Sequence, residues 1–109
     1  MKLGTILFGI IVVFLSGCKE EVPGPNEVLM VHSKFYPVSI TIPNGTTVTW
    51  RNNETGTYDP THSVTSDSNI FDSGDLYRDA IFSYTFSTSG TFTYHDNHHR
   101  EMKGVVVVL

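Results

Sequence analysis

The sequence contains very little cysteine. Cys18 is the single cysteine among 109 residues, so the chain cannot form a disulfide within itself. Because Cys18 precedes every segment with a strand-like pattern, we expect no thiolate in a folded metal site either. A folded domain of this chain must therefore be stabilised by packing.

Charge and long hydrophobic runs are also scarce. Charged residues make up 17% of the sequence and the formal net charge is -4, which argues against a protein that binds nucleic acid through a basic surface. The longest apolar run, residues 6–15, is too short for a transmembrane helix, which needs about 20 residues. A chain of 109 residues has room for one small domain.

The first residues have the pattern of a targeting segment. Lys2 precedes the apolar run, and the run ends in Leu15-Ser16-Gly17-Cys18, which resembles the lipobox of bacterial lipoproteins. The resemblance implies a signal peptide over residues 1–17, cleavage before Cys18 and acylation of Cys18. The lipid would anchor the protein to a membrane of the cell envelope, outside the cytoplasm, in the periplasm or at the surface. Residues 18–27, with their prolines and glycine, are expected to form a flexible tether.

From residue 28 onward, apolar residues alternate with polar ones at a period of two, which predicts strands and no amphipathic helix. Strands are expected over residues 28–31, 38–42, 47–50, 62–65, 82–86, 91–95 and 105–108. The turn signal Pro43-Asn44-Gly45 separates the second of these segments from the third. About seven short strands predict an all-β Greek-key sandwich over residues 28–109.

The alternation also indicates where the side chain of Asp96 points. Counting by two from Phe92 through Tyr94 leads to Asp96, so a strand that continues regularly directs this carboxylate into the interior. A buried carboxylate needs a partner, and a divalent cation flanked by imidazoles would remove the cost of burial. Alternatively, the strand ends at His95 and Asp96 caps the loop by accepting hydrogen bonds from backbone amides. The pattern leaves both interpretations open.

The end of the chain resembles a known family. Residues 94–104 read Tyr-His-Asp-x-x-His-x-x-Met-x-Gly before a valine-rich strand, and this pattern is similar to the ligand loop of cupredoxins of the plastocyanin and amicyanin type. Asp96 stands where those proteins have a cysteine. Residues 61–67 and 71–74 resemble the segment that supplies the first histidine of the family. The resemblance covers most of residues 28–109 and implies one metal ion held by four ligands, which are His62, Asp96, His99 and Met102.

This set of ligands favours copper. Two imidazoles, a carboxylate and a thioether suit Cu(II) by the Irving–Williams order, with zinc as the second choice. Without a thiolate, the copper form should lack an intense visible band and have a lower reduction potential than a thiolate site. The resemblance implies a one-electron carrier or a copper-handling protein, with a redox or copper-exchange protein as its partner. We expect the protein to be a monomer.

Several alternatives remain open. In a rival register, His95 takes the place of the cysteine and His98 that of the second histidine, which requires a longer loop before Met102. Two histidines and one carboxylate are also the ligands of non-haem iron oxygenases and of hydrolytic zinc sites, although Met102 would fill the position that such enzymes leave open. A further alternative is a metal-free interaction module whose site is vestigial.

Overall fold

The computed structural model describes residues 22–56 and 60–109. The predicted signal peptide (residues 1–17), the lipidation of Cys18 and the first part of the tether lie outside these residues. The described residues form strands, turns and loops, and none of their segments is a helix long and apolar enough to span a membrane.

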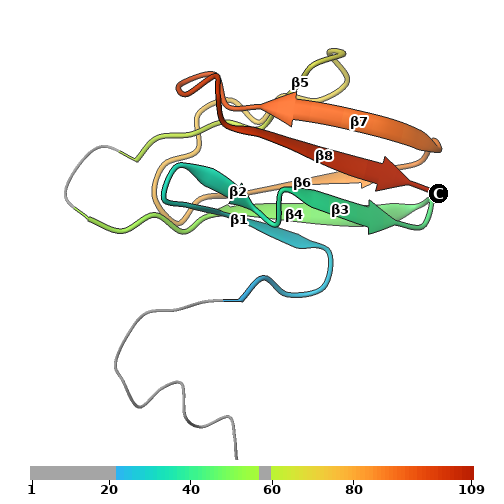
Figure 1. Ribbon diagram of the computed structural model, residues 1–109, viewed down its shortest axis with the longest axis horizontal. Helices are drawn as coiled ribbons and strands as arrows, with labels where there is room; N and C mark the ends of the chain where they lie inside the picture. The colour runs from blue at the N-terminus through green and yellow to red at the C-terminus, as the bar shows by residue number, and fades with distance from the viewer. Residues whose placement is uncertain (1–21, 57–59) are drawn as a thin grey trace, which may run out of the picture.

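The strands form two four-stranded sheets that pack face to face (Figure 1). The first sheet has the order β2-β1-β4-β6, and its strands are β1 (Glu27–Val31), β2 (Lys34–Tyr36), β4 (Thr46–Asn52) and β6 (Ile81–Phe86). The second sheet has the order β3-β8-β7-β5, and its strands are β3 (Ser39–Ile42), β5 (Thr65–Ser66), β7 (Gly90–His95) and β8 (Lys103–Val108). The all-β sandwich predicted from the sequence is confirmed.

The structure differs from the expected strands in two places. The strand β2 was not expected, and it pairs antiparallel with β1 through Leu29 and Tyr36. The strand expected over residues 62–65 is reduced to β5, because His62 forms only an isolated antiparallel bridge with Leu76. His62 therefore lies in a loop that crosses the end of the sandwich. The direction of its side chain is set by this loop and not by the alternation of a strand.

The turn at residues 43–45 carries the chain from one sheet to the other. Gly45 has a φ of 93°, a conformation that favours glycine. The strand before the turn, β3, pairs parallel with β8, and the strand after it, β4, pairs with β1 and β6. Two strands that are adjacent in the sequence thus lie in opposite layers, as in a Greek-key sandwich.

The core between the sheets is rich in aromatic side chains. Trp50 of β4 and Tyr94 of β7 are buried and meet edge to face, with 5.4 Å between their ring centroids. The ring of Tyr94 also covers Gly104 of β8, where an added Cβ would lie 2.4 Å from the Tyr94 hydroxyl oxygen. Glycine at position 104 therefore permits the close approach of β8 to the aromatic core.

The inward positions of β4 and β7 end in polar side chains at the same end of the sandwich. In β4, Trp50 and Asn52 are fully buried, and Glu54 continues this alternation beyond the strand. In β7, Tyr94 is buried and the next inward position is Asp96, which has no exposed surface. Both strands run toward the end that carries the β7–β8 loop (Figure 1), so the two sheets bring carboxylates to one buried place.

Candidate metal centre

His62 lies between two buried carboxylates. Its Nδ1 is 2.6 Å from Asp96 Oδ2, and its Nε2 is 2.8 Å from Glu54 Oε2. Its backbone is fixed by hydrogen bonds in both directions with Leu76, of 3.1 and 2.7 Å. The side chain is 1% exposed. Both ring nitrogens therefore face protein carboxylates and not water, and these contacts fix the orientation of the imidazole.

Asp96 accepts four hydrogen bonds. Its Oδ2 faces the Nδ1 atoms of His62 and His99, at 2.6 and 3.1 Å. Its Oδ1 accepts hydrogen bonds from the backbone amides of Ser63 and His98, at 2.8 and 3.0 Å. Asp96 is thus both an interior carboxylate and a cap of its loop, so the two interpretations that the sequence left open are compatible.

The ionisation of Asp96 and His62 is coupled. Burial by itself would raise the pKa of Asp96, but hydrogen bonds from His62, the His98 amide and His99 outweigh burial and lower this pKa to about 2. Burial by itself would lower the pKa of His62, but hydrogen bonds with Asp96 and Glu54 outweigh it and raise this pKa. Both directions favour an ionised Asp96 next to a protonated His62.

His99 and Met102 lie on the loop that closes over Asp96. The side chain of His99 is 39% exposed, and its ring centroid is 5.2 Å from that of His62. Met102 is 3% exposed and belongs to the core cluster. Its amide donates to the His99 carbonyl at 2.8 Å, and its carbonyl accepts from the Asp96 amide at 3.1 Å. These backbone bonds fix the loop that carries the two side chains.

The donor atoms of this cluster fit a small metal ion. His62, Asp96 and His99 each offer a ligand atom, and these atoms lie within 4.8 Å of one another. Among residues 22–56 and 60–109, this is the one group of three histidine, cysteine or acidic side chains with such spacing. Two nitrogens directed at one carboxylate oxygen suit Cu(II) or Zn(II). The sulfur of Met102 is the fourth donor that the sequence pattern implies.

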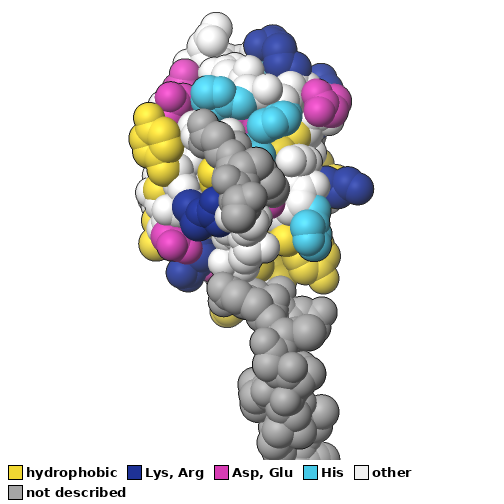
Figure 2. Space-filling view, turned by 90° about the vertical axis from the view of Figure 1, so that its left-hand side faces the viewer, with side chains coloured by type: hydrophobic (Ala, Val, Ile, Leu, Met, Phe, Trp, Pro, Cys, Tyr) yellow, Lys and Arg dark blue, Asp and Glu magenta, His cyan; other side chains and the backbone are white. Residues whose placement is uncertain are grey.

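The two other histidines of the β7–β8 region have different partners. His95 Nδ1 is 2.5 Å from Asp67 Oδ1, and its Nε2 is 2.9 Å from Asn97 Oδ1. His98 Nε2 is 2.8 Å from Asp75 Oδ1 at the surface. The structure therefore brings neither of the rival-register histidines to the His62 side chain. Figure 2 shows histidine side chains gathered near acidic ones on this end of the molecule.

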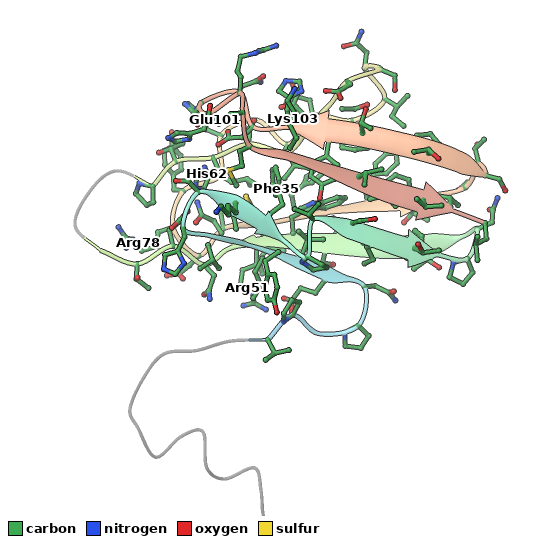
Figure 3. The ribbon with its side chains drawn as sticks, in the orientation of Figure 1. Phe35, Arg51, His62, Arg78, Glu101 and Lys103 are labelled. Atoms are coloured by element: carbon green, nitrogen blue, oxygen red, sulfur yellow. The ribbon has the colours of Figure 1, made fainter. Side chains whose placement is uncertain are left out.

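Glu54 is the member of the cluster that the sequence analysis missed. It follows β4 in a polar stretch that has the composition of a loop, yet it is 2% exposed. Counting by two from Trp50 gives Asn52 and then Glu54, so the alternation that located Asp96 also contained this signal. Figure 3 shows that His62 lies at the end of the sandwich that carries the β7–β8 loop, where Glu101 is labelled. Glu54 reaches His62 from the opposite sheet, because it follows β4.

The chain was compared with known proteins in sequence and in structure. No protein-family model matches the chain, and no curated protein matches it in a sequence comparison. Solved structures do match, and they agree with this architecture. Among solved structures, a purple cupredoxin from Nitrosopumilus maritimus matches with a TM-score of 0.67 and 26% identity, over 76% of this chain and 98% of that one. An amicyanin variant in its reduced Cu(I) form matches with a TM-score of 0.69 and 27% identity, over 83% of this chain and 87% of that one.

A larger protein contains a similar unit. The copper-containing nitrite reductase from Thermus scotoductus SA-01 matches with a TM-score of 0.68 and 28% identity, over 85% of this chain but only 24% of that one. Together, the fold and the cluster define a small β-sandwich protein with histidine and carboxylate side chains, which are candidate metal ligands, at one end. The described domain is cupredoxin-like, and it has Asp96 at the position of the cysteine.

Proposed function

We propose that this chain is a cupredoxin-like lipoprotein that binds one copper ion outside the cytoplasm and serves as a one-electron carrier or a copper-handling protein. The observation that carries the proposal is the convergence of His62, Asp96 and His99 on one point. The amicyanin and the nitrite reductase are described as copper proteins, which supports copper as the ion. The lipobox-like residues 15–18 support the lipid anchor.

The side chains have separate tasks in this proposal. His62 and His99 offer Nδ1 as neutral nitrogen donors, Asp96 offers an anionic oxygen, and Met102 offers a soft sulfur. Copper, when bound, supplies one-electron redox chemistry. Because Asp96 is a harder donor than a thiolate, the set favours the oxidised ion. The amides of Ser63 and His98 hold the carboxylate in place, so it needs little rearrangement when the charge of the site changes.

His99 gives the proposed site its access to solvent. The side chains of His62 and Asp96 are 1% and 0% exposed, whereas that of His99 is 39% exposed. An electron or a copper ion that enters or leaves the site would therefore pass by His99. A protein partner in redox chemistry or copper exchange would have to dock around the β7–β8 loop.

The test is a titration of residues 19–109, produced without the lipid, with Cu(II). We expect one tight equivalent, an electron paramagnetic resonance spectrum with nitrogen hyperfine splitting, and no intense visible band. The Asp96→Ala variant should bind more weakly and give a changed spectrum. Competition with Zn(II) measures the preference between the two ions. If the wild-type protein binds no stoichiometric copper, the proposal is wrong.

An enzyme with two histidines and one carboxylate is the second candidate, because the same three side chains could bind Fe(II) or Zn(II) and leave a position open for water. Met102 distinguishes the candidates. If its sulfur is a ligand, Met102→Leu changes the spectrum of the copper form. An unchanged spectrum would leave that position open and favour the enzyme.

A further inference from the structure

Glu54 is a buried carboxylate that contacts His62 on the side opposite to Asp96. Its Oε2 is 2.8 Å from His62 Nε2, and the side chains of both residues are 1% exposed. The amide of Glu54 donates to Asn52 Oδ1 at 3.1 Å. The carboxylate is therefore fixed both by the end of β4 and by the imidazole that it contacts.

The β1–β2 turn holds the same carboxylate. The amide of His32 donates to Glu54 Oε1 at 2.9 Å, and the amide of Ser33 donates to Oε2 at 2.7 Å. Both turn residues have left-handed backbone conformations, with φ of 54° and 57°. Two successive amides that point at one anion are a stable cradle for a carboxylate. These two hydrogen bonds hold the Glu54 carboxylate in place.

This arrangement determines which nitrogen of His62 can face a metal ion. Nε2 is committed to Glu54, so Nδ1 is the nitrogen that remains, and it faces Asp96 and His99. A carboxylate on the second nitrogen of a metal-binding imidazole fixes the ring and its tautomer and makes the other nitrogen a stronger donor. Glu54 thus prepares His62 as a ligand.

We infer that Glu54 is a positioning residue that makes the site prefer a divalent ion over Cu(I). Asp96 and Glu54 bring two negative charges to one buried imidazole, which balances the charge of a dication but exceeds that of a monocation. The inference rests on the proposed copper site. It adds that the site binds the oxidised ion, Cu(II), more tightly than Cu(I). It also predicts that Glu54 stabilises the oxidised form during electron transfer.

The experiment measures Cu(II) and Cu(I) affinities and the reduction potential of the wild-type protein and of Glu54→Gln. The variant removes the charge and keeps a side chain of the same size. We expect Cu(II) to bind about 10- to 100-fold more weakly, as is typical when the partner of a metal ligand is lost. Cu(I) affinity should change much less. Each tenfold fall in the ratio of Cu(II) affinity to Cu(I) affinity raises the reduction potential by about 59 mV for one electron.

Two further variants separate charge from structure. Glu54→Asp keeps the charge but shortens the side chain, so it should retain the wild-type ratio of Cu(II) to Cu(I) affinity even if both affinities fall. Glu27→Gln removes a carboxylate from β1 that pairs with Arg51 instead of His62, so it should leave both affinities unchanged. If Glu54→Gln and Glu54→Asp change the ratio equally, or if neither does, Glu54 acts only on the structure and the inference is wrong.

A measurement on the wild-type protein covers the case in which Glu54→Gln does not fold. In the diamagnetic Cu(I) form, nuclear magnetic resonance should detect a His62 proton on Nε2, hydrogen-bonded to a carboxylate. A proton on Nδ1 instead would overturn the inference. Absence of any copper binding by the wild-type protein would overturn the proposed function itself, which is a separate outcome.

Discussion

At the scale of single residues, Asp96 combines two tasks that usually belong to different groups. Two imidazoles share its Oδ2, and two backbone amides bind its Oδ1. The first contact places a negative charge where the candidate ligands meet, and the second fixes the loop that carries His99. A substitution at this position therefore changes the chemistry of the site and the shape of the loop together.

The change Asp96→Cys tests whether position 96 faces the ion. A thiolate at this position would be bonded directly to copper, so addition of Cu(II) should produce an intense visible band that the wild-type protein lacks. Absorption spectroscopy during a copper titration measures this difference. If the variant folds, binds copper and stays colourless, the sulfur does not reach the ion and the assignment of Asp96 is wrong.

His99 and His95 provide a matched pair for testing the register. His99→Ala removes a proposed ligand and should weaken Cu(II) binding by more than about 100-fold. Loss of a residue that only hydrogen-bonds to a ligand costs less than this. His95→Ala removes a side chain that contacts Asp67 and Asn97, so affinity should stay nearly unchanged. Isothermal titration calorimetry in the presence of a competing chelator measures both. A large loss in His95→Ala would support the rival register.

Much of the cluster could be predicted from residue patterns, and the reason is physical. Asp96 follows two inward aromatic residues, so alternation gives it an interior position if the strand continues, although the pattern by itself did not exclude a loop cap. Glu54 follows Trp50 and Asn52 in the same way, but the surrounding polar residues hid the pattern because they have the composition of a surface loop. The contact between Glu54 and His62 could not be predicted, since it depends on how a loop crosses the end of the sandwich.

At the scale of elements, the register between β7 and β8 is tied to Gly104. Tyr94 pairs with Gly104, and the aromatic ring lies across the glycine. Tyr94 is also buried and meets Phe35 edge to face, with 4.7 Å between ring centroids, so a second aromatic ring packs against it. The last strand therefore tolerates only a hydrogen atom at this point.

We predict that Gly104→Ala lowers the free energy of unfolding. The new methyl group would lie 2.4 Å from the ring carbon and oxygen of Tyr94, and forced overpacking of this kind costs about 1–3 kcal/mol. Urea denaturation followed by tryptophan fluorescence measures the loss. Gly24→Ala is the control, because its Cβ would meet only the flexible end of Glu27 at 3.3 Å, and it should change stability by less than about 0.5 kcal/mol. Equal stabilities would contradict the prediction.

The start of β1 has a pH-dependent contact. The Gly24 amide donates to Glu27 at 2.7 Å and lowers its pKa, burial opposes this, and Arg51 at 3.0 Å lowers the pKa further. A carboxylate with a lowered pKa stabilises the fold above its ordinary value of 4.5, and this contribution is lost as the pH falls through the folded value.

We therefore predict that Glu27→Gln destabilises the metal-free protein at pH 7, by less than about 1 kcal/mol because the pair is partly exposed to solvent. The difference from wild type should shrink as the pH falls below 4.5 and vanish once Glu27 is protonated in both states. Denaturation curves at several pH values, with a chelator present, measure it. A difference that stays constant across this range would contradict the electrostatic explanation.

The strands themselves were largely predictable, whereas their partners were not. Alternating residues 38–42 and 47–50 read correctly as strands because half of each lies against the core. Nothing in that alternation distinguishes a hairpin from a chain that crosses between layers. The parallel pairing of β3 with β8 joins residues 39–42 to residues 105–108, and such distant pairing depends on the whole fold and not on local pattern.

At the scale of the whole molecule, the cluster connects the two sheets at one end. Glu54 extends β4 of the first sheet, and Asp96 follows β7 of the second. His62 bridges them through its two ring nitrogens. An ion held by His62, Asp96 and His99 would therefore oppose separation of the layers.

We predict that copper stabilises the entire domain. An ion that binds only the folded state adds about 2.7 kcal/mol at a free concentration 100 times its Kd, which for a domain of this size raises the Tm by more than about 10 °C. Differential scanning calorimetry with and without Cu(II) measures this shift, and a chelator should reverse it. The His99→Ala variant, as the control, should show a much smaller shift. An unchanged Tm in the wild-type protein would indicate a metal-free module.

The parallel pair of β3 and β8 also imposes an order on biosynthesis. A ribosome makes β3 long before β8, so β3 must remain without its partner until residues 105–108 have been added. The loop over residues 96–102, which carries three of the candidate ligands, is made just before β8, and it closes only when β8 pairs with β7. A nascent chain therefore carries His62 and Glu54 but cannot yet capture an ion between the sheets. If the proposed site binds an ion, metal loading would therefore follow completion of the sandwich.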